Sequence, residues 1–484
     1  MKTSDHDHDL CCCCRRDFLQ TMGTAAGTMA LLSSGAITAL AEDKRAAPTK
    51  QPALVRGAFL YPPSETLREA GYWSWPGSSF DAEGHQRAYM AKIREIEKKL
   101  GMRIEMEEAP LDEPAGVERF LSEIKQSPPD GLLLIPFKKS HWEHVVRIVE
   151  EANVPSVVLA TLGVLLVDHI NQLHRKPGAY LISAMDDFGA VEQGMRMIRA
   201  ARRMKDGLLV NIAGSETKEV SVPRLGTRVR SIPLEQFYQE YLRTEITGPV
   251  RELAQAYLKG ARERVEPSED DVLEAARACF ALRKIVQKEG ADAIMMNCLP
   301  GLRKPHKHVP PCMGFMSLRD EGIPAGCQSD LNSTLTMMLV QELFGKPGFQ
   351  QNAAMQTEAN HYFGAHCTSP SKMNGPDGPS EPVILRSHAE AGWGTVPQVL
   401  FPAGQEVTMA QYLSGESPQM HVYGGKVVRC YPKAPGGCRT NVEMTIDEVA
   451  DACDVKGMHQ IVFFGNHARP LRTFCQLLGI EVVT

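Results

Sequence analysis

The run DGLLLIPFKKSHWEHVVRIVEEANVPSVVLA, residues 130–160, decides the fold class of this chain. Residues 131–136 are an apolar stretch of the kind that is buried on both faces of a parallel sheet. Residues 142–152 carry apolar side chains at helical spacing, and residues 155–160 form a second apolar run. Strand, helix and strand at this spacing predict a βαβ unit of a doubly wound sheet.

The same alternation of strand and helix extends in both directions from this unit. It predicts a first α/β domain at residues 54–175 and a second α/β domain at residues 176–350. The elements that carry this prediction are strands at 54–61, 103–107, 180–184, 207–213 and 292–297 and helices at 86–100, 190–202 and 269–288.

The pattern changes from about residue 351. Glycine and proline become more frequent, and short alternating runs at 383–385 and 426–430 indicate antiparallel strands. A strand at 460–464 and a helix at 470–478 close the chain. We therefore expect an α/β protein with two Rossmann-like doubly wound domains, followed by a β-rich C-terminal domain at residues 351–484.

The first forty residues have the organisation of an export signal. Arg15-Arg16-Asp17-Phe18-Leu19 has the twin-arginine pattern, and the uncharged residues 21–40 follow it. Ala39-Leu40-Ala41 then supplies small residues at the spacing that a signal peptidase needs. The pattern predicts a signal at 1–41 cleaved after Ala41, a linker at 42–53, export to the periplasm and the twin-arginine machinery as a partner. The alternative is a retained membrane anchor.

Composition argues against nucleic acid as a partner and against a fold held together by disulfides. The formal net charge is -5 and no long basic run occurs, so nucleic acid is a poor candidate partner. Four of the thirteen cysteines, residues 11–14, would leave with the signal. The other nine are odd in number and contain no CxxC pair, which argues against a disulfide scaffold, although one or two bridges could form in the periplasm.

Polar side chains follow the predicted strand that ends near residue 327. Gln328 and Asp330 come directly after it, and a predicted helix begins at Asn332. Ligands bind at the carboxyl ends of parallel strands, where Asp330 could hold a divalent cation or move a proton. Alternatively, Asp330 serves only to cap the helix that follows.

Histidines supply further candidates for a site. His306 and His308 lie in the loop after the strand at 292–297. Glu358, His361 and His366 form a second group; if their segment is a strand, His361 and His366 point to opposite faces. Three more histidines are weaker candidates, namely His388, His459 and His467.

Five segments, in this order, carry a resemblance to a known family: RDEGIPAGCQSD (319–330), NHYFGAHC (360–367), FPAGQEVT (401–408), GMHQIVFFG (457–465) and LLGIE (477–481). They resemble segments of the L-fucose isomerase and L-arabinose isomerase superfamily. The resemblance covers residues 180–484, and the order and spacing of the segments support it more than any one of them.

The resemblance implies two Rossmann-like domains, a β-rich C-terminal domain and a homo-oligomer with its active site between domains or subunits. It also implies aldose–ketose isomerisation of a small sugar with a divalent cation, usually Mn²⁺, which stabilises an enediolate. In this reading Asp330 is the general base and a metal ligand, and His366 is a second ligand.

The sequence departs from the family at two places. Gln328 stands where the family has a glutamate, and an amide cannot act as a general base. About two dozen residues before Asp330, where the family has another carboxylate, this chain has His306 and His308. We expect Gln328 with His306 or His308 to hold the sugar. Two functions follow: an exported sugar isomerase, or an inactive periplasmic carbohydrate-binding protein of the same fold.

Overall fold

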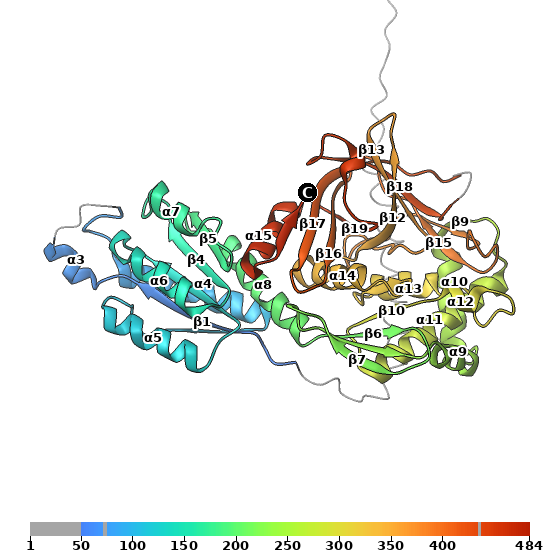
Figure 1. Cartoon of the computed structure of the whole chain (residues 1–484), viewed down its shortest axis with the longest axis horizontal. Helices are drawn as coiled ribbons and strands as arrows, with labels where there is room; N and C mark the ends of the chain where they lie inside the picture. Colours follow the sequence, from blue (N-terminus) through green and yellow to red (C-terminus); the bar gives the residue numbers. More distant parts are fainter. Residues whose placement is uncertain (1–49, 71–74, 434–436) are drawn as a thin grey trace, which may run out of the picture.

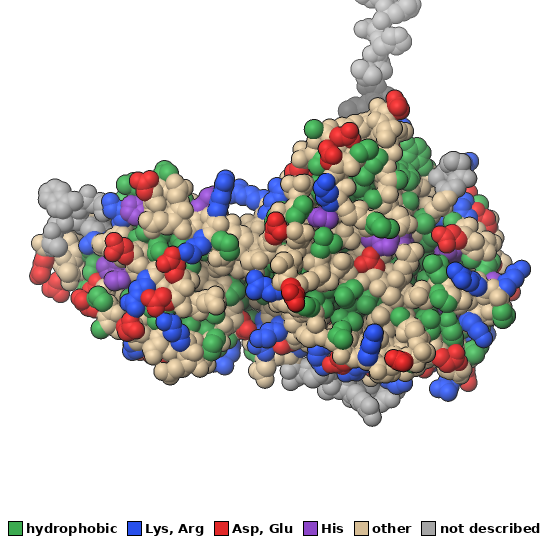
Figure 2. All heavy atoms as spheres, in the orientation of Figure 1, with side chains coloured by type: hydrophobic (Ala, Val, Ile, Leu, Met, Phe, Trp, Pro, Cys, Tyr) green, Lys and Arg blue, Asp and Glu red, His purple; other side chains and the backbone are tan. Residues whose placement is uncertain are grey.

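The computed structural model describes residues 50–70, 75–433 and 437–484, so the predicted signal at 1–41 and most of the predicted linker lie outside the described residues. The chain has two lobes of unequal size (Figure 1). The smaller lobe is the N-terminal α/β part, and the larger lobe combines the second α/β part with the C-terminal strands. The outline narrows between them in the space-filling view (Figure 2).

The first sheet is parallel and has the strand order β2-β1-β3-β4-β5. Its strands are β1 (Leu54–Leu60), β2 (Arg103–Met106), β3 (Gly131–Pro136), β4 (Ser156–Thr161) and β5 (Ala179–Ala184). The predicted boundary at 175/176 falls between β4 and β5, which pair with each other, so this sheet continues to Ala184.

Helices cover both faces of the first sheet, as the apolar run at 131–136 predicted. Leu133 and Ile135 belong to a core on the side of α4 (Ala82–Leu100) and α8 (Phe188–Lys205). The alternate residues Leu132 and Leu134 belong to a core that includes residues of α5 (Pro114–Gln126) and α6 (Trp142–Ala152). Successive strand side chains point to opposite faces, so a continuous apolar strand requires a helix layer on each side.

The second sheet has the order β11-β10-β6-β8-β7, with β7 antiparallel to β8 and the other pairs parallel. Strand β11 lies at the edge, and α14 (Leu331–Phe344) follows it directly. The strands are β6 (Leu208–Ile212), β7 (Lys218–Ser221), β8 (Arg228–Ile232), β10 (Ala293–Met296) and β11 (Ala325–Cys327).

The C-terminal part is β-rich, as predicted. Six antiparallel strands close into a ring in the order β16-β19-β12-β13-β18-β17, because β17 also pairs with β16. These strands are β12 (Phe349–Gln356), β13 (His361–His366), β16 (Glu406–Leu413), β17 (Gln419–Arg429), β18 (Thr440–Ile446) and β19 (His459–Phe464). Strand β20 (Glu481–Val483) adds to β17, and a separate sheet joins β9 (Ala261–Arg264), β14 (Val383–Arg386) and β15 (Val396–Val399).

The fold is therefore mixed α/β, with parallel sheets and a closed C-terminal sheet. The helices of the described ranges are too short or too polar to cross a lipid bilayer.

A buried carboxylate links three neighbouring strands of the ring. The Glu443 side chain on β18 is inaccessible to solvent and accepts hydrogen bonds from His361 Nδ1 at 2.6 Å, Arg429 Nε at 2.7 Å and the Tyr431 hydroxyl. Arg429 lowers the pKa of Glu443 to about 2, and His361 and Tyr431 add to this effect against the opposing effect of burial. The network joins β13, β17 and β18.

Replacing Glu443 with Gln should lower the free energy of unfolding near pH 7 by about 1–3 kcal/mol, because His361, Arg429 and the Tyr431 hydroxyl lose the charged acceptor that they share. The pKa of Glu443 falls on folding from 4.5 to about 2. The contribution is therefore complete above about pH 4.5 and is lost as the pH falls toward about 2. Urea denaturation should show wild type and Glu443→Gln converging over this window. The exposed Glu416→Gln is the control, and a constant difference over the window would contradict the prediction.

Candidate active site at the end of β11

The structure brings Asp330 together with a histidine 129 residues away. Asp330 follows β11, and its Oδ2 lies 2.5 Å from Nδ1 of His459, the first residue of β19. Nε2 of His459 lies 2.7 Å from Oδ1 of Asn352 on β12, the residue with which His459 pairs across the two strands. The side chains of Asp330 and His459 keep 18% and 12% of their surface exposed, so a small molecule can reach the pair.

Asp330 also caps α14, as the alternative interpretation of the sequence proposed. Its Oδ1 accepts a hydrogen bond of 2.9 Å from the backbone N–H of Ser333. The carboxylate thus binds a helix end with one oxygen and a histidine with the other. Burial alone would raise the pKa of Asp330, but the hydrogen bonds from His459 and Ser333 outweigh it and lower that pKa below its ordinary value.

His366, at the end of β13, lies beside this pair. Its ring centroid is 5.9 Å from that of His459, and only 2% of the residue is exposed. Neither ring nitrogen has a hydrogen-bond partner among the described residues. Burial lowers the pKa of His366 to about 3, and the charge of Arg319 adds to this effect. His366 is therefore a neutral ring with one donor and one acceptor.

The loop after His366 is held by α13 (Cys312–Asp320). Arg319 is buried and donates from Nη1 to the carbonyl of Thr368 at 3.2 Å. Asp320 accepts hydrogen bonds of 2.8 Å from the backbone N–H groups of Ser371 and Lys372. These contacts fix the backbone that positions His366.

The turn between β11 and Asp330 has an uncommon backbone. Gln328 and Ser329 have φ angles of 58° and 53°, in the left-handed region that residues other than glycine rarely adopt. Gln328 is exposed at this turn, next to Asp330. Such strain is concentrated at functional sites in proteins, and here it directs Asp330 toward both α14 and His459.

The other predicted sugar-binding residues occupy different surroundings. His306 is exposed and lies against Trp393, with ring centroids 4.3 Å apart. His308 is buried between Phe237 and Tyr238, with its Nδ1 2.7 Å from the carbonyl of Val309. No hydrogen bond or ring contact within the described part of the chain links either histidine to Asp330, so their role in sugar binding stays a prediction.

The histidines on β13 follow the predicted strand parity. His361 contacts Glu443 on one face of β13, whereas His366 is buried beside His459 on the other face. The sequence did not identify His459 and Asn352 as the partners of Asp330. His459 was one of several weaker candidates, and the segment GMHQIVFFG that carries the family resemblance contained it.

A divalent cation was the predicted cofactor, with Asp330 and His366 as ligands. Within residues 50–70, 75–433 and 437–484, no three His, Cys, Asp or Glu side chains are grouped so that they could hold a metal ion. The described residues thus do not fit the Mn²⁺ ion that the resemblance implies, and we derive no catalytic step through it.

Comparison with known proteins indicates a distant sugar-isomerase relative. No protein-family model matches the chain. Sulfoquinovose isomerases from Priestia aryabhattai and Priestia megaterium (strain ATCC 12872 / QMB1551) are each 21% identical to it over 281 residues. The match covers 52% of this chain and 62% of each relative, which is less than two thirds of their length.

Among solved structures, D-threo-3-hydroxyaspartate dehydratase from Delftia sp. HT23 aligns with 88% of this chain and 85% of its own, at 10% identity. Its TM-score of 0.11 carries no information about the fold.

The helix cap formed by Asp330 and its contact with His459 can be separated by substitution. Asp330→Ala removes both and should lower the free energy of unfolding by about 1 kcal/mol through loss of the cap. Asp330→Asn keeps a side-chain oxygen for the Ser333 N–H and should cost less. Urea denaturation of both variants tests this, and equal losses would show that the cap contributes nothing of its own.

Proposed function

We propose that this chain catalyses aldose–ketose isomerisation of a sugar at the Asp330–His459 pair. The observation that carries the proposal is the placement of an ionised carboxylate, a histidine and the neutral His366 together at the carboxyl end of β11. The distant likeness to sulfoquinovose isomerases supports the same reaction class.

The reaction needs a base that moves a proton between adjacent carbons. Asp330 is the proposed base, since each carboxylate oxygen keeps a lone pair beyond its hydrogen bond to Ser333 or His459. It removes the proton from C2 of the aldose and returns it to C1, while the hydroxyl proton moves from O2 to O1. One ring nitrogen of His366, which has no hydrogen-bond partner among the described residues, can bond the carbonyl or the adjacent hydroxyl oxygen once the substrate is bound.

Substrate binding is proposed for two sets of exposed residues, one next to Asp330 and one in a separate loop. Gln328 extends from the turn next to Asp330 and can bond sugar hydroxyls through its amide. The loop after α12 (Leu299–Leu302) exposes three cations, Arg303, Lys304 and Lys307. Such charges suit a sugar with an anionic substituent, so a sulfonated hexose belongs in the substrate panel beside neutral aldoses.

Gln328 favours a second candidate function, a carbohydrate-binding protein without catalysis. The family resemblance places a glutamate at this position, and glutamine cannot exchange protons. Gln328→Glu separates the two functions: increased activity would support a weakened isomerase site, whereas sugar binding without activity in either form would support the binding protein.

Deuterium exchange tests the isomerase proposal. In heavy water, with and without Mn²⁺, the protein should introduce deuterium at C2 of one sugar of a panel containing sulfoquinovose, L-fucose and L-arabinose. Asp330→Asn should reduce the rate about 10²–10⁴-fold, the usual contribution of a general base. His361→Gln, which lies on the opposite face of β13, is the matched control and should keep the rate. Absence of exchange with every sugar would refute the proposal.

We also infer that the protein is exported by the twin-arginine route, from the residues at 15–41. Replacing both arginines, Arg15→Lys and Arg16→Lys, should keep the chain in the cytoplasm at its full length. Cell fractionation and N-terminal sequencing measure this, with wild type expected in the periplasm and beginning at Glu42. A periplasmic double variant would contradict the inference.

Two finer structural proposals accompany this function. Parallel pairing and helices on both faces support a Rossmann-like arrangement of the first sheet, and we extend this to the second. The family resemblance also implies a homo-oligomer, which sedimentation would measure.

A further inference from the structure

Five of the nine cysteines in the described part of the chain lie near one another, and one of them, Cys367, is next to His366 in the chain. Cys312, Cys367 and Cys438 pack together against Val396, and Cys327 contacts Cys298. They come from five separate segments of the sequence: Cys298, Cys312, Cys327, Cys367 and Cys438. All five are free thiols in this structure, and together with neighbouring side chains they form no metal-binding group within the described ranges.

Cys367 and Cys438 are brought together by the pairing of β13 with β18. His366 is opposite Thr440 in this ladder, so Cys367 directly follows one member of the pair and Cys438 precedes the other by two residues. The two strands lie side by side in the larger lobe (Figure 1). The two thiols contact each other.

The two thiols differ in exposure and acidity. Cys367 is 5% exposed, whereas Cys438 is half-buried and reachable from solvent. The contact with Cys367 lowers the pKa of Cys438, while the same contact and burial raise the pKa of Cys367. The accessible thiol is thus the better nucleophile of the pair.

We propose that Cys367 and Cys438 form a reversible disulfide, with Cys438 as the attacking thiol and Cys367 as the resolving thiol. The oxidant is a low-molecular-weight disulfide. The Cys438 thiolate attacks one of its sulfurs, the oxidant's S–S bond breaks, and one small thiolate leaves. Cys367 then releases its proton to solvent and attacks the Cys438 sulfur, which expels the second small molecule. Two protein thiols are oxidised and one small disulfide is reduced to two thiols.

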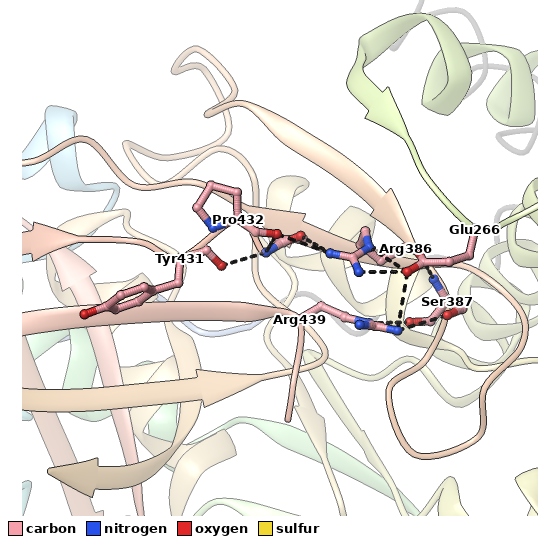
Figure 3. A network of polar contacts seen from close by, with 7 residues as sticks. Glu266, Arg386, Ser387, Tyr431, Pro432 and Arg439 are labelled. Carbon is pink, nitrogen blue, oxygen red and sulfur yellow. Dashed lines mark hydrogen bonds and ion pairs between the residues drawn. The ribbon is translucent and has the colours of Figure 1, made fainter. Parts of the chain in front are cut away.

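The segment that carries Cys438 is held in place by a charge network (Figure 3). Arg439, the next residue, donates to the carbonyl of Ser387 at 2.8 Å and lies 3.7 Å from Glu266. Arg386 binds the same carboxylate at 2.7 Å and lowers the pKa of Glu266 to about 2. The disulfide would therefore join two segments that are already fixed, with little rearrangement.

The disulfide would act directly on the backbone next to His366. It would tie the end of β13 to the start of β18 and close a loop of the chain between residues 367 and 438. Because a long closed loop restricts the unfolded chain, the oxidised form should be the more stable one. This inference does not depend on the proposed isomerase function, since it concerns the thiols alone.

Peptide mapping of the full-length protein tests the proposal. The Cys453→Ser variant removes an exposed thiol that would react with the oxidant independently. After incubation with oxidised glutathione, acid quenching and alkylation, mass spectrometry should detect peptides containing Cys367 and Cys438 joined by a disulfide. The melting temperature should rise and return to its original value with reductant. Cys279→Ser, at a buried thiol outside the group, is the matched control and should form the same bond.

Single variants test the order of attack. In Cys367→Ser, glutathione should remain attached to Cys438, because the resolving thiol is missing. In Cys438→Ser, Cys367 should stay a free thiol. A mapped bond from Cys438 to Cys312 or to residues 11–14, or persistent glutathione on Cys438 while Cys367 is present, would overturn the proposal. Mapping of the Cys453→Ser protein alone decides the pairing if either single variant fails to fold.

Discussion

The side-chain amide of Gln350 joins the two β systems of the larger lobe, and the site depends on that junction. Cys327 lies on β11, the edge strand of the second sheet. Its backbone N–H donates to Gln350 Oε1 at 2.9 Å, and its carbonyl accepts from Gln350 Nε2 at 3.2 Å. Gln350 is fully buried, so without this pairing the edge strand and the amide would each leave buried polar groups unsatisfied. The amide therefore fixes β12 against β11.

This junction sets the geometry of Asp330 and His459. Asp330 follows Cys327 by three residues, and Asn352 follows Gln350 by two on the same strand. Because Asn352 pairs with His459 across β12 and β19, the position of Gln350 determines where His459 meets the carboxylate. A second contact supports the arrangement from the helix side, since Thr336 of α14 accepts a hydrogen bond of 2.8 Å from the Tyr412 N–H on β16. The positions of Asp330 and His459 thus depend on how the second sheet and the C-terminal ring are placed against each other.

That origin explains how much the sequence could predict. Local periodicity predicted β3, α6 and β4 nearly to the residue, because an apolar run and a helical stripe are local properties. The cap formed by Asp330 and the opposite orientation of His361 and His366 also follow from neighbours in the chain. The Asp330–His459 contact depends on strand order and register over 129 residues, which no spacing rule contains. For the same reason the sequence could not show that His308 packs between Phe237 and Tyr238.

The surroundings of Asp330 and His366 favour different charge states of these two side chains. Asp330 stays ionised because two donors face it, and His366 stays neutral because burial and the adjacent Arg319 oppose its protonation. A buried imidazole without a protein partner costs free energy, and a helix cap with left-handed residues on its N-terminal side does also. Both costs fall at the site, since Gln328 and Ser329 precede Asp330 and His366 lies beside His459. Such local costs are expected where a chain has been selected to present polar atoms to a ligand, and less so where it has been selected only for stability.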